Sequence, residues 1–283
     1  MKKIILLPNK LKDSELLITK QVVTKLVSLG LQPYVADEFS SLTEFGALTY
    51  DEVIDGELVV VIGGDGSVID ASRVALDCDI PLLGINLGKV GYLATVDPGE
   101  IDKLEKLISG DYVINEKMLL LATKNTKHGV VISERPAVND VVIRRGNSYG
   151  ISDLRVENVI GDQVVYRADG VVISTPAGST AYALSAGGPV ISHTLDSIMV
   201  TPICPHSFFN RAIVYGPEEQ IKVTNLGDLA LDISIDGRQF CSLLKDESCI
   251  VTKNIKKIKM MTFGESNLFT SLSKKIKLLH ETV

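Results

Sequence analysis

An aspartate stands inside a glycine turn, GGDG at residues 63–66. The apolar run VVVI precedes the turn and a helix-like segment follows it, an arrangement in which backbone N–H groups and the helix dipole attract anions such as phosphate. A carboxylate about 4 Å from a phosphate charge would cost roughly 4 kcal/mol at an effective dielectric constant of about 20. Asp65 is therefore expected to face either a substrate hydroxyl that it deprotonates or a Mg²⁺ ion held between it and phosphates. Both arrangements indicate phosphoryl transfer.

The turn matches neither of the two common glycine loops. The position three beyond Gly66 is Ile69, so the dinucleotide fingerprint GxGxxG is absent, and no GK[ST] of a P-loop follows. A structural alternative stays open, because Asp is a favoured N-cap and Asp65 could simply cap the following helix.

A second stretch, YRADGVVISTPAGSTAYALSAGGPV at residues 166–190, combines charged, hydroxyl and glycine residues. Small residues let a backbone approach a ligand closely, and hydroxyls donate and accept hydrogen bonds with ribose or phosphate. A flexible linker is the alternative, but Val171, Val172, Ile173 and Leu184 interrupt the composition of a linker. The stretch favours a ligand-binding loop that opens a short helix.

Three shorter sequence features indicate ligand-binding residues less strongly. Asn139-Asp140 precedes the strand-like VVIRRG, and NLGKVGYLA at 86–94 follows a strand end, where open α/β sheets bind ligands. Either could be an ordinary loop. His206, in PICPHS, is one of four histidines, and a lone histidine is more often structural than functional.

The first part of the chain alternates strand-like and helix-like patterns, which predicts a parallel sheet flanked by helices. Strands are expected at 3–8, 57–64 and 80–86, and helices at 16–30, 67–77 and 99–110.

From about residue 116 onward, short Val- and Ile-rich runs separated by turn residues predict a largely antiparallel β domain. The runs lie at 117–125, 140–146, 151–159, 162–170, 220–225, 229–237 and 248–261. Helical periodicity returns at 268–280, so the chain is expected to rejoin the first domain at its end. The expected domains are 1–115, 116–255 and a returning segment at 256–283.

Composition excludes several function classes. A net charge of −6, 5% aromatic residues and no Trp argue against nucleic acid as a partner. No apolar run approaches the roughly 18 residues of a membrane span, and MKKIILLP is expected to be a strand rather than a signal peptide. The four cysteines show neither CxxC nor a spacing typical of zinc sites or disulfide frameworks, which favours a soluble, cytoplasmic protein. No membrane partner is expected.

Taken together, the motifs resemble those of the NAD kinase family, enzymes that phosphorylate NAD to NADP. The similar stretches are GGDGS at 63–67, NLGKVGYLA at 86–94, ND at 139–140, RADGVVISTPAGSTAYALSAGGP at 167–189 and PICPHS at 202–207. The block at 167–189 is highly specific. GGDG alone is shared with diacylglycerol, sphingosine and phosphofructokinase-type kinases, so it indicates only the superfamily.

The resemblance implies an α/β N-terminal domain plus a β-rich, β-sandwich-like C-terminal domain of the NAD kinase/diacylglycerol kinase-like type. It implies that Asp65 accepts the proton of the adenosine 2′-hydroxyl and that Gly63 and Gly64 form the phosphate loop. The substrate-binding residues it implies are Gly66, Asn139, Asp140, Arg167, Asp169, Thr180, Ala181, Tyr182 and Ser185, with Tyr92, His206 and Arg238 as further candidates.

The resemblance also implies a divalent metal ion, Mg²⁺ by preference, with ATP or polyphosphate as phosphoryl donor. No side chain is assigned as a metal ligand, because the donor's own phosphates are expected to provide most contacts. The resemblance implies a homo-oligomer, either a dimer or a homotetramer.

Three positions depart from the family pattern: Asp140 replaces the usual Glu, Tyr92 replaces Phe, and Arg238 replaces Gln. Two other functions are weighed. A lipid kinase of the same superfamily would carry basic amphipathic segments, which this acidic sequence lacks. A non-catalytic dinucleotide sensor would have no need of Asp65, which the sequence retains.

Overall fold

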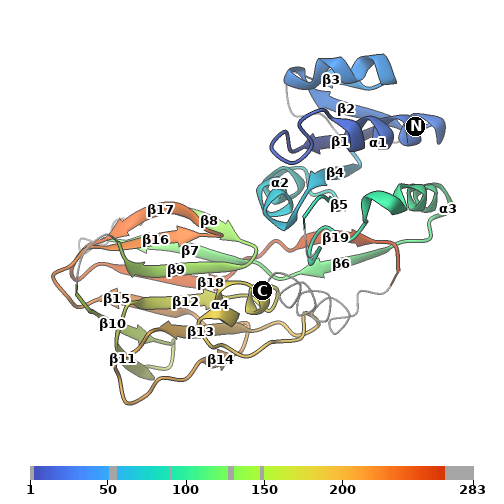
Figure 1. Cartoon of the computed structure of the whole chain (residues 1–283). Coiled ribbons are helices and arrows are strands. Elements are labelled where there is room, and N and C mark those ends of the chain that lie inside the picture. Colours follow the sequence, from blue (N-terminus) through green and yellow to red (C-terminus); the bar gives the residue numbers. More distant parts are fainter. Residues whose placement is uncertain (1–2, 51–55, 89–90, 127–130, 147–149, 265–283) are drawn as a thin grey trace, which may run out of the picture. The chain divides into compact units, whose positions relative to one another are not determined.

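The computed structural model describes residues 3–50, 56–88, 91–126, 131–146 and 150–264. The chain divides into two structural units (Figure 1). Unit 1 comprises residues 1–116 and 258–283, and unit 2 comprises residues 117–257.

Unit 1 is built on a seven-stranded sheet of order β3-β2-β1-β4-β5-β19-β6. Its strands are β1 (Lys3–Pro8), β2 (Gln32–Ala36), β3 (Leu48–Tyr50), β4 (Leu58–Gly63), β5 (Leu82–Asn86), β6 (Val113–Lys117) and β19 (Ile258–Thr262). The pairs among β1 to β5 are parallel, as predicted for the first part of the chain, and β19 also pairs in parallel with β5. Every residue of β4 is buried, since both faces of a parallel sheet are covered, and this explains its uninterrupted apolar run.

The helical segments of unit 1 are α1 (Leu17–Ser28), η1 (Asp37–Phe45), α2 (Asp65–Asp77), η2 (Pro98–Glu105) and α3 (Lys106–Ser109). α1 buries Val22, Val23 and Leu26, and the chain leaves it through Gly30 at φ +74°. The single helix predicted for 99–110 is instead a 3₁₀ segment followed by one α-helical turn. Its kink lies at Glu100, whose side chain forms a capping box with Asp97 and whose φ is −116°.

Unit 2 contains two six-stranded antiparallel sheets (Figure 1). The first, in spatial order, consists of β11 (Gln163–Ala168), β10 (Ser152–Glu157), β15 (Ile221–Asn225), β18 (Ser248–Lys253), β7 (Leu120–Asn125) and β8 (Val131–Ala137). The second consists of β14 (Ile213–Tyr215), β13 (Ile198–Ile203), β12 (Gly170–Ser174), β9 (Asp140–Arg145), β16 (Leu231–Ile235) and β17 (Arg238–Leu243).

One hydrophobic cluster takes residues from both sheets of unit 2, which makes the unit a sandwich. Leu154 and Tyr166 come from the first sheet, and Ile143, Ile173 and Ile233 come from the second. The predicted fold class, an α/β domain plus a β-sandwich-like domain, is therefore confirmed.

The other face of the second sheet is covered by the end of the glycine- and hydroxyl-rich stretch. There a 3₁₀ turn, η3 (Gly178–Thr180), leads into the short helix α4 (Tyr182–Ser185), as predicted. Ala183 of α4 is buried against Val172 and Met199 of the sheet.

The strand-like run at 248–261 is divided between the two units, and its second half lies in the segment 256–283 that was expected to rejoin the first domain. β18 belongs to the first sheet of unit 2, whereas β19 pairs with β5 in the parallel sheet of unit 1. Both runs are apolar and strand-like, and nothing within either run specifies its partner strand. The helix predicted for 268–280 lies outside the described residues.

No helix in the described ranges is long and apolar enough to cross a membrane.

Candidate active site

The GGDG turn joins the end of β4 to the start of α2, and its first glycine has no room for a side chain. A Cβ on Gly63 would lie 2.5 Å from the Ser67 Cβ, and a Cβ on Gly64 would clash with the ammonium group of Lys12. A Cβ on Gly66 would meet nothing within 4 Å. The turn is therefore closed by Ser67 at Gly63, faces the Lys12 ammonium at Gly64 and is open at Gly66.

The carboxylate of Asp65 accepts hydrogen bonds from three backbone N–H groups of the loop after β5. Oδ1 accepts from Leu93 at 2.8 Å and Ala94 at 3.2 Å, and Oδ2 accepts from Tyr92 at 3.2 Å. Gly64, not Asp65, is the N-cap of α2, and no side chain caps the helix. The helix-cap alternative for Asp65 is therefore wrong.

Two of the motifs meet at this turn. Besides the Asp65 contacts, the Leu87 N–H donates to the Gly63 carbonyl at 2.6 Å. The NLGKVGYLA loop is thus held against GGDG, although its residues 89–90 lie outside the described part of the chain. The carboxylate of Asp65 has a fixed orientation, which a general base needs in order to meet a substrate proton.

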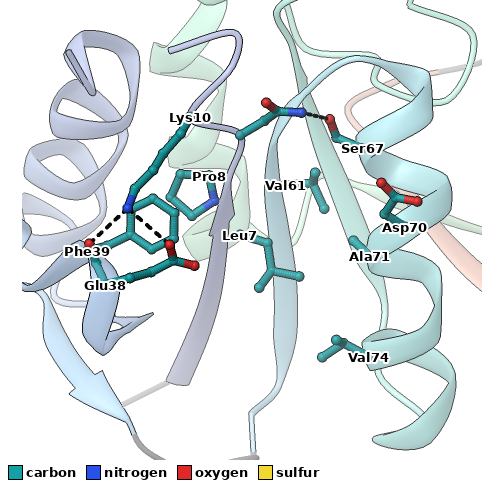
Figure 2. A pocket seen from close by; sticks show the side chains of 11 residues that line it. Leu7, Pro8, Lys10, Glu38, Phe39, Val61, Ser67, Asp70, Ala71 and Val74 are labelled. Atoms are coloured by element: carbon teal, nitrogen blue, oxygen red, sulfur yellow. Dashed lines mark hydrogen bonds and ion pairs between the residues drawn. The ribbon is translucent and has the colours of Figure 1, made fainter. Parts of the chain in front are cut away.

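A cavity of about 450 Å³ opens next to the turn, where β1 and β4 end (Figure 2). Its apolar wall includes Leu7, Val61 and Val74, and Ser67 and Asp70 of α2 line it as well. The chain goes from β1 outward to β2 and β3 and then returns to β4 on the other side of β1. The cavity therefore lies at a topological switch point, the usual ligand site of an open α/β sheet.

The opposite side of this cavity is formed by Lys10, Glu38 and Phe39 (Figure 2). The Lys10 ammonium lies 3.0 Å from Glu38 Oε2 and 4.6 Å from the centroid of the Phe39 ring. The attraction between the ammonium and the ring places a cation and an aromatic side chain together on this wall.

In unit 2, the Asn139-Asp140 pair packs against the hydroxyl-rich loop. The Thr175 N–H donates to the Asn139 carbonyl at 2.9 Å, and Thr175 Oγ1 donates to the Val138 carbonyl at 2.7 Å. A Cβ on Gly178 would clash with the Asn139 carbonyl, so only glycine fits there. The structure thus brings together two motifs that lie about forty residues apart in the sequence.

Asp236 belongs to the same group, and sequence reasoning missed it. Its carboxylate accepts hydrogen bonds from the N–H groups of Val138 at 2.8 Å, Asn139 at 2.7 Å and Asp140 at 3.1 Å. The signal in the sequence was Asp236-Gly237 after a strand, which reads only as a hairpin turn.

Asp140 is the buried acid of this group. Its side chain is 5% exposed, and burial together with the nearby charge of Asp236 raises its pKa to about 7. Burial also raises the pKa of Asp236, while the hydrogen bonds from three backbone N–H groups lower it. Ser174 lies directly opposite Asp140 in the sheet, and its buried Oγ has no hydrogen-bond partner within the described residues. A buried polar atom without a partner thus lies next to the buried acid.

Replacing Asp140 with Asn is expected to stabilise the protein at alkaline pH. The folded-state pKa of Asp140 is raised, so its contribution to stability is present below about pH 4 and is lost as pH rises toward 7. Asp140→Asn should raise the free energy of unfolding by about 1–3 kcal/mol at pH 8 and change it little at pH 4.5. Urea unfolding at both pH values tests this, with Asp246→Asn at an exposed turn as control. An equal effect at both pH values would contradict the assignment.

A separate group is formed by Arg167, Asp169 and His206. Arg145 binds the Asp169 carboxylate through Nε at 2.8 Å and through its terminal nitrogen at 3.2 Å. The His206 N–H donates to the Arg167 carbonyl at 2.7 Å. Asp169 therefore has a structural partner, while the side chains of Arg167 and His206 are exposed.

The two groups of unit 2 lie at opposite ends of β12. The register pairs Ser174 with Asp140 at one end and Gly170 with Arg144 at the other. Five residues of strand span about 16 Å. Within one chain, the structure does not bring Arg167, Asp169 and His206 to Asn139 and Asp140.

The remaining predicted residues lie on the loop, on α4 and at a hairpin. Thr180 is buried and its Oγ1 donates to the Ala177 carbonyl at 3.1 Å. Ala181 is half-buried, and Tyr182 and Ser185 are exposed on α4. Arg238, also exposed, begins β17.

A metal ion would find no complete ligand set in the part of the chain that the structure describes, since no three His, Cys, Asp or Glu side chains cluster there. Mg²⁺ in kinases is held largely by substrate phosphates and water. The residues present therefore fit a metal that arrives with the phosphoryl donor rather than a metal held by protein side chains alone.

An acid fixed in a glycine turn beside a cavity at the switch point of a parallel sheet is the arrangement expected of a phosphotransferase. Comparison with known families agrees. The model of the ATP-NAD kinase N-terminal domain matches residues 4–112, and that of the ATP-NAD kinase C-terminal domain matches residues 138–263. The chain belongs to the ATP-NAD kinase family and is a phosphotransferase.

Named relatives lead to the same family. The chain is 34% identical to the NAD kinase of Caldanaerobacter subterraneus subsp. tengcongensis over 283 residues, which cover 98% of this chain and 99% of the relative. It is also 34% identical to the NAD kinase of Clostridium perfringens strain 13 over 281 residues, covering 98% and 99%.

Solved structures share the fold. Yeast NADH kinase complexed with NADH superposes with a TM-score of 0.88 at 22% identity, covering 98% of this chain and 88% of that chain. An NAD kinase from Archaeoglobus fulgidus in complex with ATP gives a TM-score of 0.71 at 20% identity, covering 96% and 99%.

Proposed function

We propose that this protein transfers the terminal phosphoryl group of ATP to the 2′-hydroxyl of the adenosine ribose of NAD, producing NADP. The observation that carries the proposal is the Asp65 carboxylate, which is held by three N–H groups in a glycine turn that is open at Gly66. Family membership supplies the reaction.

In this reaction Asp65 accepts the proton of the 2′-hydroxyl as its oxygen bonds to the terminal phosphorus and the bond from phosphorus to ADP breaks. Gly63 and Gly64 let the backbone pass close to the phosphates. Mg²⁺ bound to the donor would neutralise phosphate charge.

The cavity at the switch point is the proposed site of the donor's nucleoside. A volume of about 450 Å³ lies in the range of small-molecule sites, and its apolar walls meet hydroxyl and carboxylate groups on α2. Polyphosphate, which has no nucleoside, would leave this cavity unused, so the cavity supports ATP as the preferred donor.

The dinucleotide is proposed to bind the polar groups of unit 2. Asn139 and Asp140 lie together with the loop that carries Thr180, and the unpartnered Ser174 hydroxyl lies beside Asp140. Ala181, Tyr182 and Ser185 continue this surface. Arg167 and Asp169 are proposed to contact the other half of NAD, with His206 and Arg238 as further contacts.

We also propose that the protein is cytoplasmic and forms a dimer or tetramer. The four cysteines are unpaired, in keeping with a reducing compartment. The oligomer is supported by the family resemblance and is tested by light scattering of the purified protein.

The deciding experiment is NADP formation from NAD, with Mg²⁺-ATP and with polyphosphate in parallel reactions. Product with ATP is expected. Asn139→Ala is expected to weaken NAD binding about tenfold, because an amide that hydrogen-bonds the ligand is lost, and calorimetry measures the dissociation constant.

Other outcomes would favour the alternatives. NAD binding without product from either donor would indicate a dinucleotide sensor. Phosphorylation of a lipid without NAD binding would indicate a lipid kinase. An unchanged dissociation constant for Asn139→Ala would indicate that Asn139 is a structural turn residue and does not bind NAD.

A further inference from the structure

Asp236 lies in the tight turn between β16 and β17, yet its carboxylate acts on a segment about a hundred residues earlier in the chain. Its backbone is in the left-handed region, with φ of 50°. In this conformation its side chain reaches the backbone of residues 138–140.

Three successive N–H groups of that segment converge on this one carboxylate. Oδ2 accepts from Val138, and Oδ1 accepts from both Asn139 and Asp140. The Asp236 N–H in turn donates to the Asp140 carbonyl at 3.0 Å. Four hydrogen bonds between two distant turns fix the backbone from which the Asn139 and Asp140 side chains project.

A carboxylate is the only side chain that can accept all three hydrogen bonds, because it has two acceptor oxygens and no donor. Asn in its place keeps one acceptor oxygen but presents an NH₂ group to the remaining N–H. Asn also tolerates the left-handed conformation, so an Asp236→Asn variant can keep the turn while losing the charge and one acceptor.

We propose that Asp236 is a positioning residue for NAD, which orients the Asn139-Asp140 segment so that both side chains meet the dinucleotide. This inference rests on the proposed function. Asp236 acts through residues 138–140 and is itself assigned no contact with the substrate.

The electrostatics provide a second readout, the titration of Asp140 as seen in NAD binding. The charge of Asp236 is one cause of the raised pKa of Asp140, after burial. The positive charge of Arg135 on β8 lowers the pKa of Asp236. β12 and the 175–180 segment, which pack against Asp140, contain no titratable residue. Removing the Asp236 charge should therefore move the titration of Asp140 to lower pH.

The test compares wild-type protein with Asp236→Asn and with the matched control Asp246→Asn. Asp246 is an exposed aspartate at φ 63°, another left-handed turn position of unit 2. The dissociation constant of NAD is measured by calorimetry from pH 5.5 to 8.5, and KM and kcat are measured on the full chain with Mg²⁺-ATP.

For Asp236→Asn, the dissociation constant and the KM of NAD should rise about tenfold, while kcat stays within about twofold of wild type. The wild-type dissociation constant should change across pH 7, and in the variant this change should occur at lower pH. The control should match wild type in every measurement.

Wild-type-like NAD binding by Asp236→Asn, with an unmoved pH profile, would overturn the positioning role while leaving the proposed function intact. A wild-type protein that neither binds NAD nor forms NADP would overturn both. If Asp236→Asn does not fold, Asp236→Glu replaces it: the Glu keeps the charge but shifts the carboxylate by one methylene. NAD binding by Asp236→Glu should weaken with the pH profile retained, and wild-type affinity would overturn the proposal.

Discussion

The Asp65→Asn variant is expected to lose about two orders of magnitude or more in kcat for NADP formation while binding NAD almost as wild type does. Asn accepts no proton from the ribose hydroxyl, so the step that needs a base is slowed, whereas contacts made in unit 2 are unchanged. Steady-state kinetics and calorimetry on the same preparation measure the two quantities.

A loss of activity in Asp65→Asn could have a second cause, which the experiment must distinguish from the loss of the base. Asp65 also anchors the loop at Tyr92, Leu93 and Ala94, so a loss of activity could follow from a displaced loop. In the variant, the Asn oxygen can still accept from Leu93 and Ala94, but the Asn NH₂ group faces the Tyr92 N–H, which loses its acceptor. The loss of one hydrogen bond should lower the midpoint of thermal unfolding by only about 2–4 °C.

Asp77→Asn is the matched control, since Asp77 is the last residue of the same helix and is exposed. It should retain wild-type kcat, KM and unfolding midpoint. Full activity of Asp65→Asn would exclude Asp65 as the base. A large fall in unfolding midpoint together with a raised KM for ATP would assign the loss to the displaced loop.

Lys124→Met is expected to be the most destabilising of the substitutions considered, at about 3–5 kcal/mol. Lys124 Nζ lies 2.9 Å from Glu247 Oε2, and the two side chains are only 8% and 9% exposed. Lys124 also donates to the Ser242 carbonyl at 2.6 Å, and Glu247 accepts from the Leu244 N–H at 2.8 Å. Removing the lysine leaves a carboxylate buried without its cation.

Urea unfolding measures this effect, and two further variants define its cause. Lys124→Met combined with Glu247→Leu should recover most of the lost stability, because no charge then remains buried. Lys245→Met breaks an exposed pair, with Lys245 and Asp228 side chains 51% and 89% exposed, and should cost no more than about 0.5 kcal/mol. A loss below about 1 kcal/mol for Lys124→Met would show that water reaches the buried pair.

Local features of this protein could be predicted from the sequence because they are encoded within a few neighbouring residues. The buried strand before residue 63, the glycine turn and the helix after it depend on periodicity and on glycine at the turn. The short helix after Thr180 follows from the same kind of local signal. The order of the motifs was enough to identify the family.

Partners distant in the sequence could not be predicted this way. Asp65 binds N–H groups 27 to 29 residues away, and Asp236 binds N–H groups 96 to 98 residues away. Asp-Gly after a strand predicts a turn, but whether its carboxylate meets another turn depends on which strands pair.

The sequence by itself determined the α/β and β-rich regions, the family and the acid of the glycine turn. Only the tertiary structure decided that Asp65 anchors a second loop and that Asp236 holds residues 138–140. It also decided that β19 pairs with β5 in the sheet of unit 1. Finally, it placed Arg167 and Asp169 a strand length from Asn139. Periodicity and turn chemistry act over a few residues, whereas hydrogen bonds between distant backbone groups form only after strand order and register are set.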